Sequence, residues 1–309
     1  MTDTALSDVA LDETGLAPKP GASLRTVLAA LAEDRLAVLG VALVLLTVVA
    51  ALIAPLIAPQ NPYDLATLDL MDGGLAPGAE SLSGKSYWLG TDEQGRDMLS
   101  AILYGLRISL YVAGLATLIA LAIGMAMGIS AAYFGRWTDT IIMRLVDLQL
   151  GFPAILTALI LLAVLGRGVD KVIVALVMTQ WAYYARVVRG SALVENQKDY
   201  VAAARCLALS HRRIMARHLM PNCLPPLIVV ATVQIAHAVS LEATLSFLGV
   251  GVPVTEPSLG LLIANGYDYL LSGRYWVAVF PGIALVITIV GINLVGDRLR
   301  DVLNPRLQR

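Results

Sequence analysis

Long uninterrupted apolar runs, separated by polar segments, constrain this chain more than any other feature. The first run, residues 36–58, contains no charged side chain. A helix needs about 20 consecutive apolar residues to cross the hydrocarbon core of a bilayer. Lipid cannot satisfy backbone hydrogen-bonding groups, so a helix is the expected form of each run. The chain is therefore predicted to be an all-α integral membrane protein.

About six spans are expected along the 309 residues. They cover residues 36–58, 108–133, 141–165, 172–190, 224–245 and 277–296. The fourth span is the most polar, because Gln180, Trp181, Tyr183 and Tyr184 interrupt it. The first run starts too late and is too long for a signal peptide, so it is expected to remain in the membrane.

The spans divide the chain into regions. A polar tail, residues 1–35, precedes the first span, and an outer-side segment, residues 59–107, follows it. A five-helix core covers residues 108–296 and contains a basic loop, residues 191–223, on the inner side. Residues 297–309 form a second tail.

The composition agrees with a membrane protein. Hydrophobic residues make up 58% of the chain and charged residues only 15%, whereas a soluble domain carries about 25% charged residues. The net charge of -1 predicts no nucleic-acid partner, since a protein that binds nucleic acid usually has a basic face. The two cysteines, Cys206 and Cys223, predict neither a disulfide framework nor a metal site.

The distribution of positive charge predicts the orientation. With the N-terminus inside, 16 of the 22 Lys and Arg residues fall in or beside inner segments. The other six lie outside: Lys85, Arg96, Arg107, Arg167, Lys171 and Arg274. The positive-inside rule therefore predicts that both termini are cytoplasmic.

Residues 199–213 of the basic loop form the most informative segment. Between Val201 and Leu209 only Arg205 is charged, and the composition favours a short helix. A helix that is apolar nearly all round favours burial. Two interpretations fit: the helix docks into a groove on another protein, or it lies on the membrane surface or against its own bundle.

Four segments resemble one family of transporters. They are Tyr200–Asn222, Leu89–Asp97, Glu242–Gly251 and Asn293–Asp301. Their order and spacing over most of the chain are similar to the C-type permease subunit of dipeptide and oligopeptide ABC importers. Relatives in that family import nickel or glutathione, so the resemblance leaves the solute open.

The resemblance implies a type I ABC importer permease fold that works by alternating access. It implies that this chain is not an enzyme and that ATP and Mg²⁺ bind to two separate ATPase subunits. Further partners implied are a second homologous permease, an outer solute-binding protein and the lipid of a bacterial inner membrane. No cofactor is expected in this chain.

The same resemblance identifies the basic loop as an ATPase-coupling loop. The residues it implicates are Asp199, Tyr200, Val201, Ala202, Ala203, Ala204, Arg205, Leu207, Ala208 and Arg213. The family usually has Glu at the position of Ala202 and Gly at that of Ala208. Alanine, unlike glycine, cannot adopt a turn with positive φ at low energetic cost, so we expect Ala208 to exclude such a turn. Coupling to the ATPase is then expected either to weaken or to depend on Asp199, Arg205 and Arg213.

A stripe of small residues runs along the second span. It comprises Ala116, Ala120, Gly124, Gly128 and Ala132, one every fourth residue. Small residues let helices approach closely in lipid. The stripe is expected either to pack against another helix of this chain or to form a seam with another subunit.

A polar stripe marks the fifth span. Gln234, His237, Ser240 and Thr244 fall within an arc of about 120° on a helix. Polar side chains inside a membrane usually face an interior or a water-filled path. The stripe could line the solute route or form interhelical hydrogen bonds. Glu242, on another face, is expected near the outer end, where solvent could reach it.

Other classes of function are less well supported. Residues 79–86 nearly spell a phosphate-binding loop, but the first glycine is replaced by Ala79 and no strand-to-helix pattern surrounds it. An ion-coupled secondary transporter would need ionisable residues within the spans, and few occur beyond His237 and Glu242. A membrane enzyme would need a catalytic constellation, which the sequence does not suggest.

Overall fold

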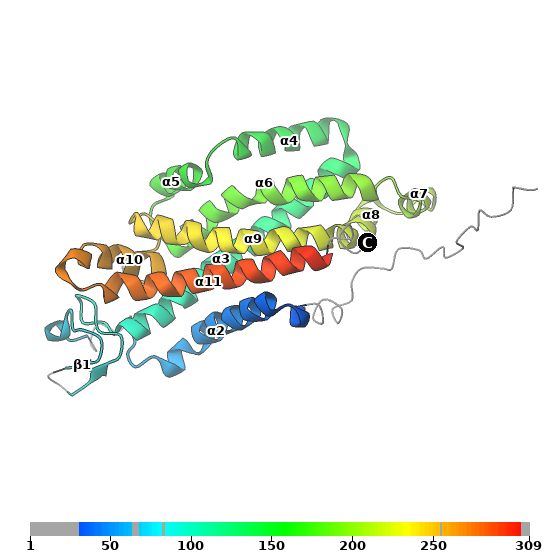
Figure 1. Ribbon diagram of the computed structural model, residues 1–309. Coiled ribbons are helices and arrows are strands. Elements are labelled where there is room, and N and C mark those ends of the chain that lie inside the picture. Colours follow the sequence, from blue (N-terminus) through cyan, green and yellow to red (C-terminus); the bar gives the residue numbers. More distant parts are fainter. Residues whose placement is uncertain (1–30, 64–67, 82–83, 254, 304–309) are drawn as a thin grey trace, which may run out of the picture.

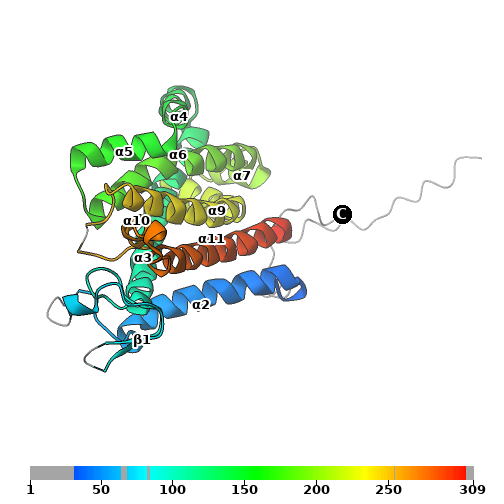
Figure 2. The same cartoon turned by 60° about the vertical axis from the view of Figure 1, so that its left-hand side comes forward.

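The computed structural model describes residues 31–303, apart from 64–67, 82–83 and 254. Residues 1–30 of the first predicted tail and residues 304–309 of the second lie outside the described residues. Five long helices form the bundle: α2 (Arg35–Ile57), α3 (Met98–Phe134), α6 (Val169–Glu195), α9 (Met220–Phe247) and α11 (Trp276–Leu303). Four of them, α2, α6, α9 and α11, lie side by side with their long axes roughly aligned, and α3 crosses them obliquely (Figures 1 and 2). The fold is therefore all-α with membrane-spanning helices, as predicted.

Shorter elements sit at the two ends of this bundle. The β1 end carries η2 (Leu70–Asp72), β1 (Ala79–Glu80), β2 (Ser86–Tyr87), α10 (Leu259–Tyr267) and η4 (Leu270–Ser272). The α7 end carries α7 (Asp199–Cys206), α8 (His211–Ile214) and the π-helical turn η3 (Met215–Leu219). The start of α2 and the end of α11 also lie at the α7 end (Figures 1 and 2).

The apolar spans differ from the expected six in two places. Four helical stretches are long and apolar enough to cross a membrane: α2, α3, the continuous stretch His211–Phe247 and α11. A fifth would be the pair α4 (Arg136–Leu150) and α5 (Ala154–Leu165). The expected fourth span lies in α6, which is 27 residues long but less apolar than these stretches.

The expected third span, residues 141–165, is broken. Helices α4 and α5 meet at an angle of 92°, with Gly151, Phe152 and Pro153 between them. Proline has no N–H to donate, and it disfavours helical geometry in the residue before it, so α4 ends ahead of Pro153. Ion pairs Arg189–Asp139 and Arg186–Asp147 then hold α4 beside α6.

Helix α3 is longer than expected. It begins at Met98, so residues 98–107 are helical and do not belong to an irregular outer segment. Asp97 caps it: one carboxylate oxygen accepts the Ser100 N–H at 2.8 Å and the Ser100 hydroxyl at 2.6 Å. An acidic residue with this pattern is a strong helix start, and it continues the helix from the membrane into the folded β1 end.

Buried polar groups order the β1 end. Asp72 accepts the hydroxyls of Ser81 at 2.6 Å and Tyr87 at 2.9 Å, and burial together with that hydrogen bond raises the pKa of Tyr87 to about 12. Strands β1 and β2 pair antiparallel, so residues 79–86 are not the strand–loop–helix of a phosphate site. The Trp276 indole donates to the Thr91 carbonyl at 3.1 Å and joins this end to α11.

The motif at residues 89–97 also lies in this end. Asp92 and Arg96 form a buried ion pair at 2.7 Å. Gly95 has a φ of +73°, and a Cβ there would lie 2.1 Å from the Asp69 carbonyl oxygen. The motif is thus a compact turn that needs glycine and holds its two opposite charges against each other.

Glu242 corrects one expectation. It is completely buried, where the sequence suggested that solvent could reach it. Its carboxyl oxygens accept the hydroxyls of Ser109 at 2.7 Å and Ser246 at 2.8 Å. Because Ser109 belongs to α3, Glu242 joins α3 to α9 below the β1 end.

Candidate functional sites

Helix α7, from Asp199 to Cys206, has two different faces. Val201 and Ala204 are buried and pack into the main hydrophobic cluster of the bundle with Ile214 and Leu219. Ala202, Ala203 and Cys206 are exposed, and Leu207, which follows the helix, exposes 74% of its surface. The helix is therefore not apolar and free all round: one face packs on its own chain and the other is open.

Hydrogen bonds from Tyr200 hold α7 against the bundle. Its phenol donates to the Glu195 carboxylate at the end of α6, at 2.6 Å. The Asn222 amide of α9 donates to the same phenol oxygen at 3.2 Å. Burial and then the Glu195 carboxylate raise the pKa of Tyr200. Tyr200 therefore links α7 to both α6 and α9.

Arg205 turns back toward the bundle. Its guanidinium donates to the Asn196 side-chain oxygen at 2.6 Å and lies 5.3 Å from the ring centre of Tyr133 in α3. Within the part of the chain that the structure describes, the exposed side chains of Asp199 and Arg213 form no ion pair. The charges of Asp199 and Arg213 thus remain available to a partner.

The end of α7 corrects the expectation for Ala208. Its φ is +52°, so alanine keeps the left-handed geometry that we expected it to exclude. The Leu209 N–H donates to the Ala204 carbonyl at 3.2 Å and the Ala208 N–H to the Arg205 carbonyl at 2.9 Å. This pair of bonds is a Schellman cap, which favours glycine; an alanine there costs about 1 kcal/mol.

The five small residues of the α3 stripe are buried, and the two glycines among them pack against α6. These residues are Ala116, Ala120, Gly124, Gly128 and Ala132. A Cβ on Gly124 would lie 2.4 Å from the Cβ of Tyr184, and one on Gly128 would lie 2.6 Å from the Ala185 carbonyl oxygen. The stripe is therefore occupied by a helix of the same chain, and α3 and α6 form the most extensive helix contact in the described bundle.

The polar stripe of α9 divides into buried and exposed members. Gln234 is buried, whereas His237 and Thr244 are exposed and Ser240 is half-buried. The hydroxyls of Ser240 and Thr244 donate to carbonyls one turn earlier in the same helix, at 3.0 and 2.8 Å. They therefore do not join α9 to another helix of this chain. His237 is exposed on α9.

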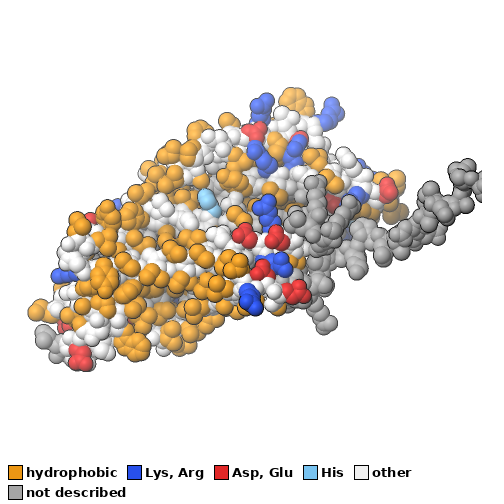
Figure 3. All heavy atoms as spheres, in the orientation of Figure 1, with side chains coloured by type: hydrophobic (Ala, Val, Ile, Leu, Met, Phe, Trp, Pro, Cys, Tyr) orange, Lys and Arg blue, Asp and Glu red, His pale blue; other side chains and the backbone are white. Residues whose placement is uncertain are grey.

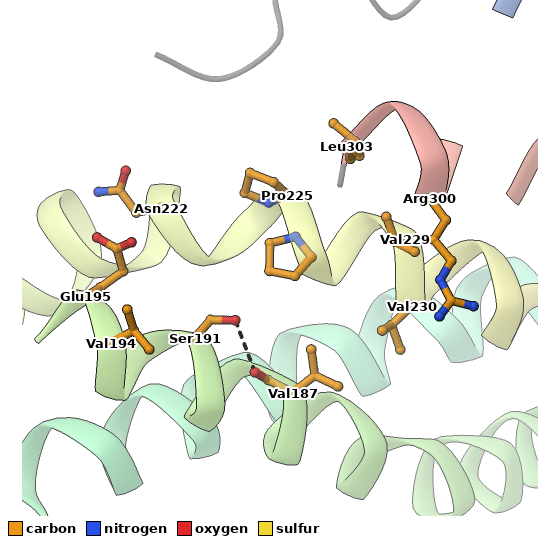
Figure 4. Close-up of a pocket in the computed structure, with 11 residues that line it drawn as sticks. Val187, Ser191, Val194, Glu195, Asn222, Pro225, Val229, Val230, Arg300 and Leu303 are labelled. Carbon is orange, nitrogen blue, oxygen red and sulfur yellow. Dashed lines mark hydrogen bonds between the residues drawn. The ribbon is translucent and has the colours of Figure 1, made fainter. Parts of the chain in front are cut away.

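A cavity of about 660 Å³ continues this face toward the α7 end. It lies between α6, α9 and α11, and Figure 4 shows Glu195 at one side and Arg300 at the other. At about 100° per residue, Pro226 and Val230 fall on the same side of α9 as His237 and Thr244. The exposed polar face and the cavity therefore form one continuous surface along α9.

Sequence reasoning missed this cavity. The signal available was the pair Pro225–Pro226 inside α9. Proline cannot donate to the carbonyl four residues earlier, so two adjacent prolines leave carbonyls without their helical partners. Such unpaired carbonyls are tolerated within a membrane where they face a cavity or protein. The cluster around the buried Glu242 was also missed, because its serines come from distant parts of the sequence.

Comparison with known proteins places the chain among transport proteins. Residues 120–309 match the family described as "Binding-protein-dependent transport system inner membrane component". Residues 24–77 match the "N-terminal TM domain of oligopeptide transport permease C".

Individual relatives cover most of the chain. A Brucella suis protein, named provisionally as a peptide transport system permease, is 42% identical over 87% of this chain and 88% of its own length. The dipeptide transport system permease protein DppC of Bacillus subtilis is 35% identical over 90% of this chain and 84% of its own length. The di/tripeptide permease DppC of Pseudomonas aeruginosa is 35% identical, with 90% of each chain covered.

A solved structure shares the arrangement of the helices. A chain of the MetNI methionine ABC transporter, in an inward-facing conformation, superposes with a TM-score of 0.53 and 23% sequence identity. The match covers 66% of this chain and 97% of that one. At this identity the likeness concerns the fold alone.

Proposed function

The chain belongs to the family of binding-protein-dependent transport system inner membrane components, and we propose that it is the permease subunit of an ATP-driven importer of dipeptides or oligopeptides. The names of its relatives in Bacillus subtilis and Pseudomonas aeruginosa support the class of solute. They are permeases for dipeptides and for di- and tripeptides.

The open face of α7 is the observation that best supports the proposed coupling to an ATPase subunit. Ala202, Ala203 and Leu207 expose apolar surface next to the unpaired charges of Asp199 and Arg213. Burying such surface is favourable by about 25 cal/mol per Å². A groove on an ATPase subunit is the proposed partner, and that subunit binds ATP and Mg²⁺. Tyr200 passes the movement of α7 to α6 and α9.

The proposed solute path follows the open face of α9. It runs from Thr244, Ser240 and His237 to the cavity between α6, α9 and α11. A second permease facing this surface would close the path on its other side. Gln234 is buried in this chain and has a packing role in the proposal.

The proposed orientation places the α7 end in the cytoplasm of a bacterium and the β1 end outside its inner membrane. Lys and Arg side chains gather toward the α7 end, while a broad band of hydrophobic side chains covers the middle (Figure 3). The positive-inside rule favours this arrangement. An outer solute-binding protein would then deliver peptide to the β1 end.

Uptake into proteoliposomes tests this function. The chain is co-purified with its partner subunits and supplied with a labelled dipeptide, the binding protein and ATP. We expect ATP-dependent uptake that His237→Leu alters without loss of the ATPase subunits, while Val279→Leu, an exposed position on α11, leaves uptake unchanged. Purification without any ATPase, or uptake that needs no ATP, would contradict the proposal.

Labelling tests the orientation. In a Cys206→Ser background, Lys85→Cys at the exposed β1 end should react with an impermeant thiol reagent added to whole cells. The unaltered Cys206 should react only in inverted vesicles. The opposite pattern would place the α7 end outside.

A further inference from the structure

A second cavity lies between α2 and α3, toward the β1 end. Its volume is about 680 Å³. Its apolar lining is formed by Val48, Ala51 and Leu52 of α2 with Ile108 and Leu110 of α3, and its polar lining by Tyr63, Arg107 and Tyr111. It therefore combines a hydrocarbon-like wall with one cation and two phenols.

This cavity is separate from the proposed solute path. Ser109 and Ala113 mark the side of α3 that packs on α9, through Glu242 and through a shared hydrophobic cluster. At about 100° per residue, Arg107 and Tyr111 point to the opposite side of α3. A ligand held there would thus lie on the far side of α3 from His237.

The depth of Arg107 matches the edge of a bilayer. Helix α3 has 37 residues, which corresponds to about 55 Å, against about 30 Å for a hydrocarbon core. A centred helix would leave about eight residues outside at each end. Arg107 is the tenth residue of α3, so it lies near the level of the phospholipid phosphates, where tyrosines are also enriched.

Arg107 has no anionic partner in the described part of the chain. Arg96 pairs with Asp92 and Arg274 with Glu93, whereas Arg107 forms neither an ion pair nor a hydrogen bond there. Burial raises the pKa of Tyr63, Glu256 adds to that rise and Arg107 opposes it. The guanidinium therefore lies within electrostatic reach of the Tyr63 phenol and has its five N–H donors to offer.

We propose that this cavity binds one phospholipid, whose phosphate accepts hydrogen bonds from Arg107 and whose acyl chain lies along Val48, Ala51 and Leu52. The planar guanidinium matches a phosphate with two parallel hydrogen bonds. The phenols of Tyr63 and Tyr111 flank the same site as further donors. The lipid fills the space between α2 and α3 and holds the first helix on the bundle, whatever solute the transporter carries.

Native mass spectrometry of the assembled transporter, titrated with phosphatidylglycerol, tests the proposal. The wild type should retain one phospholipid that Arg107→Gln retains about tenfold less tightly or worse, as expected for losing a charge-assisted hydrogen bond. Arg107→Lys keeps the charge but loses the paired geometry and should fall between them. Arg167→Gln, an exposed arginine outside this cavity, should bind like the wild type.

A second variant covers the case in which Arg107→Gln does not assemble. Leu52→Trp fills the apolar wall at a position that is 70% exposed, so it should assemble and exclude the acyl chain. Equal lipid retention by wild type, Arg107→Gln and Leu52→Trp would overturn the proposal. So would displacement of the lipid by excess dipeptide, or an adduct with the mass of a peptide, because either places the solute at Arg107.

Discussion

The α3–α6 contact and helix α7 both rely on small apolar residues, yet only the α3–α6 contact is complete within this chain. In the α3–α6 contact, Gly124 and Gly128 bring the two backbones together, and Thr117 donates to Gln180 across it at 3.2 Å. In α7, Val201 and Ala204 are covered while Ala202, Ala203 and Leu207 are open.

The difference shows that small apolar residues have different effects in lipid and in water. Between helices in lipid there is no hydrophobic drive, so close backbone approach supplies the attraction through packing. At the end of a bundle that faces water, the same residues expose surface whose burial is favourable. The α3–α6 contact therefore serves the fold, and we propose that the open face of α7 serves assembly. Substitutions in the two regions should affect different measurements.

The largest effect is expected from Gly124→Leu. Its Cβ alone would lie 2.4 Å from that of Tyr184 and 2.6 Å from the Trp181 carbonyl oxygen. Overpacking a helix contact costs roughly 1–3 kcal/mol and occasionally more. Because one of the neighbouring atoms belongs to the backbone, which can shift little, we expect the free energy of unfolding to fall by an amount near or above the upper end of that range. Thermal melting of the purified chain measures it. Gly114→Leu is the control, because nothing lies within 4 Å of the position that a Cβ would take there. Equal melting temperatures of the two variants would show that Gly124 is not part of the contact.

Ala204→Asp should lower stability next most strongly. Ala204 packs into the main cluster of the bundle, so a carboxylate there loses its hydration without a known partner. Burying an unpaired polar group costs about 1–3 kcal/mol on the basis of protein mutations. Both the melting temperature and ATPase association should fall. A normal melting temperature would show that α7 is not held by this face.

Leu207→Asp should separate assembly from fold. Because Leu207 is mostly exposed, the isolated chain should melt like the wild type. Association with the ATPase should weaken by roughly 1.5–3 kcal/mol, the value of burying one leucine side chain, as measured by titration in detergent. Ser210→Asp, exposed in the same loop, is the control. Normal association of the Leu207→Asp variant with the ATPase would show that Leu207 is not part of the docking surface.

Ala208→Gly should have the smallest effect. Glycine relieves the left-handed strain at φ +52°, but it also gives the unfolded chain more freedom, which costs about 0.4–1 kcal/mol. The net gain should stay below about 1 kcal/mol and appear as slower amide exchange at Leu209, whose N–H closes the cap. Faster exchange there would mean that alanine is unstrained.

The fold class and the family could be read from the sequence because both rest on patterns that run along the chain. Apolar runs and motif spacing are local, and they identified a membrane permease correctly. The break at Pro153 was also encoded locally, but the largely apolar sequence on both sides of it obscured it. The start of α3 at Asp97 was missed because ten helical residues project beyond the membrane-length run.

Features made by distant residues could not be predicted. The carboxyl of Glu242 is buried because Ser109 reaches it from a different helix, 133 positions away. The cavity beside α9 is lined by residues of α6, α9 and α11 that lie far apart in the sequence. The two faces of α7 depend on what lies beneath it, which periodicity over eight residues does not specify. The sequence singled out a candidate coupling segment but could not assign a role to each side chain.

The reactivity of Cys206 tests the central claim most directly, since it reports on the open face of α7 without any substitution. Cys206 is exposed and the other cysteine, Cys223, is buried, so a maleimide reagent should modify only Cys206 in the isolated chain. If the open face of α7 docks on an ATPase subunit, assembly of the complex should slow this reaction at least about tenfold, because the thiol must wait for dissociation or local opening. Modification of Cys206 at the same rate in the isolated chain and in the assembled, ATPase-containing transporter would contradict docking through this face.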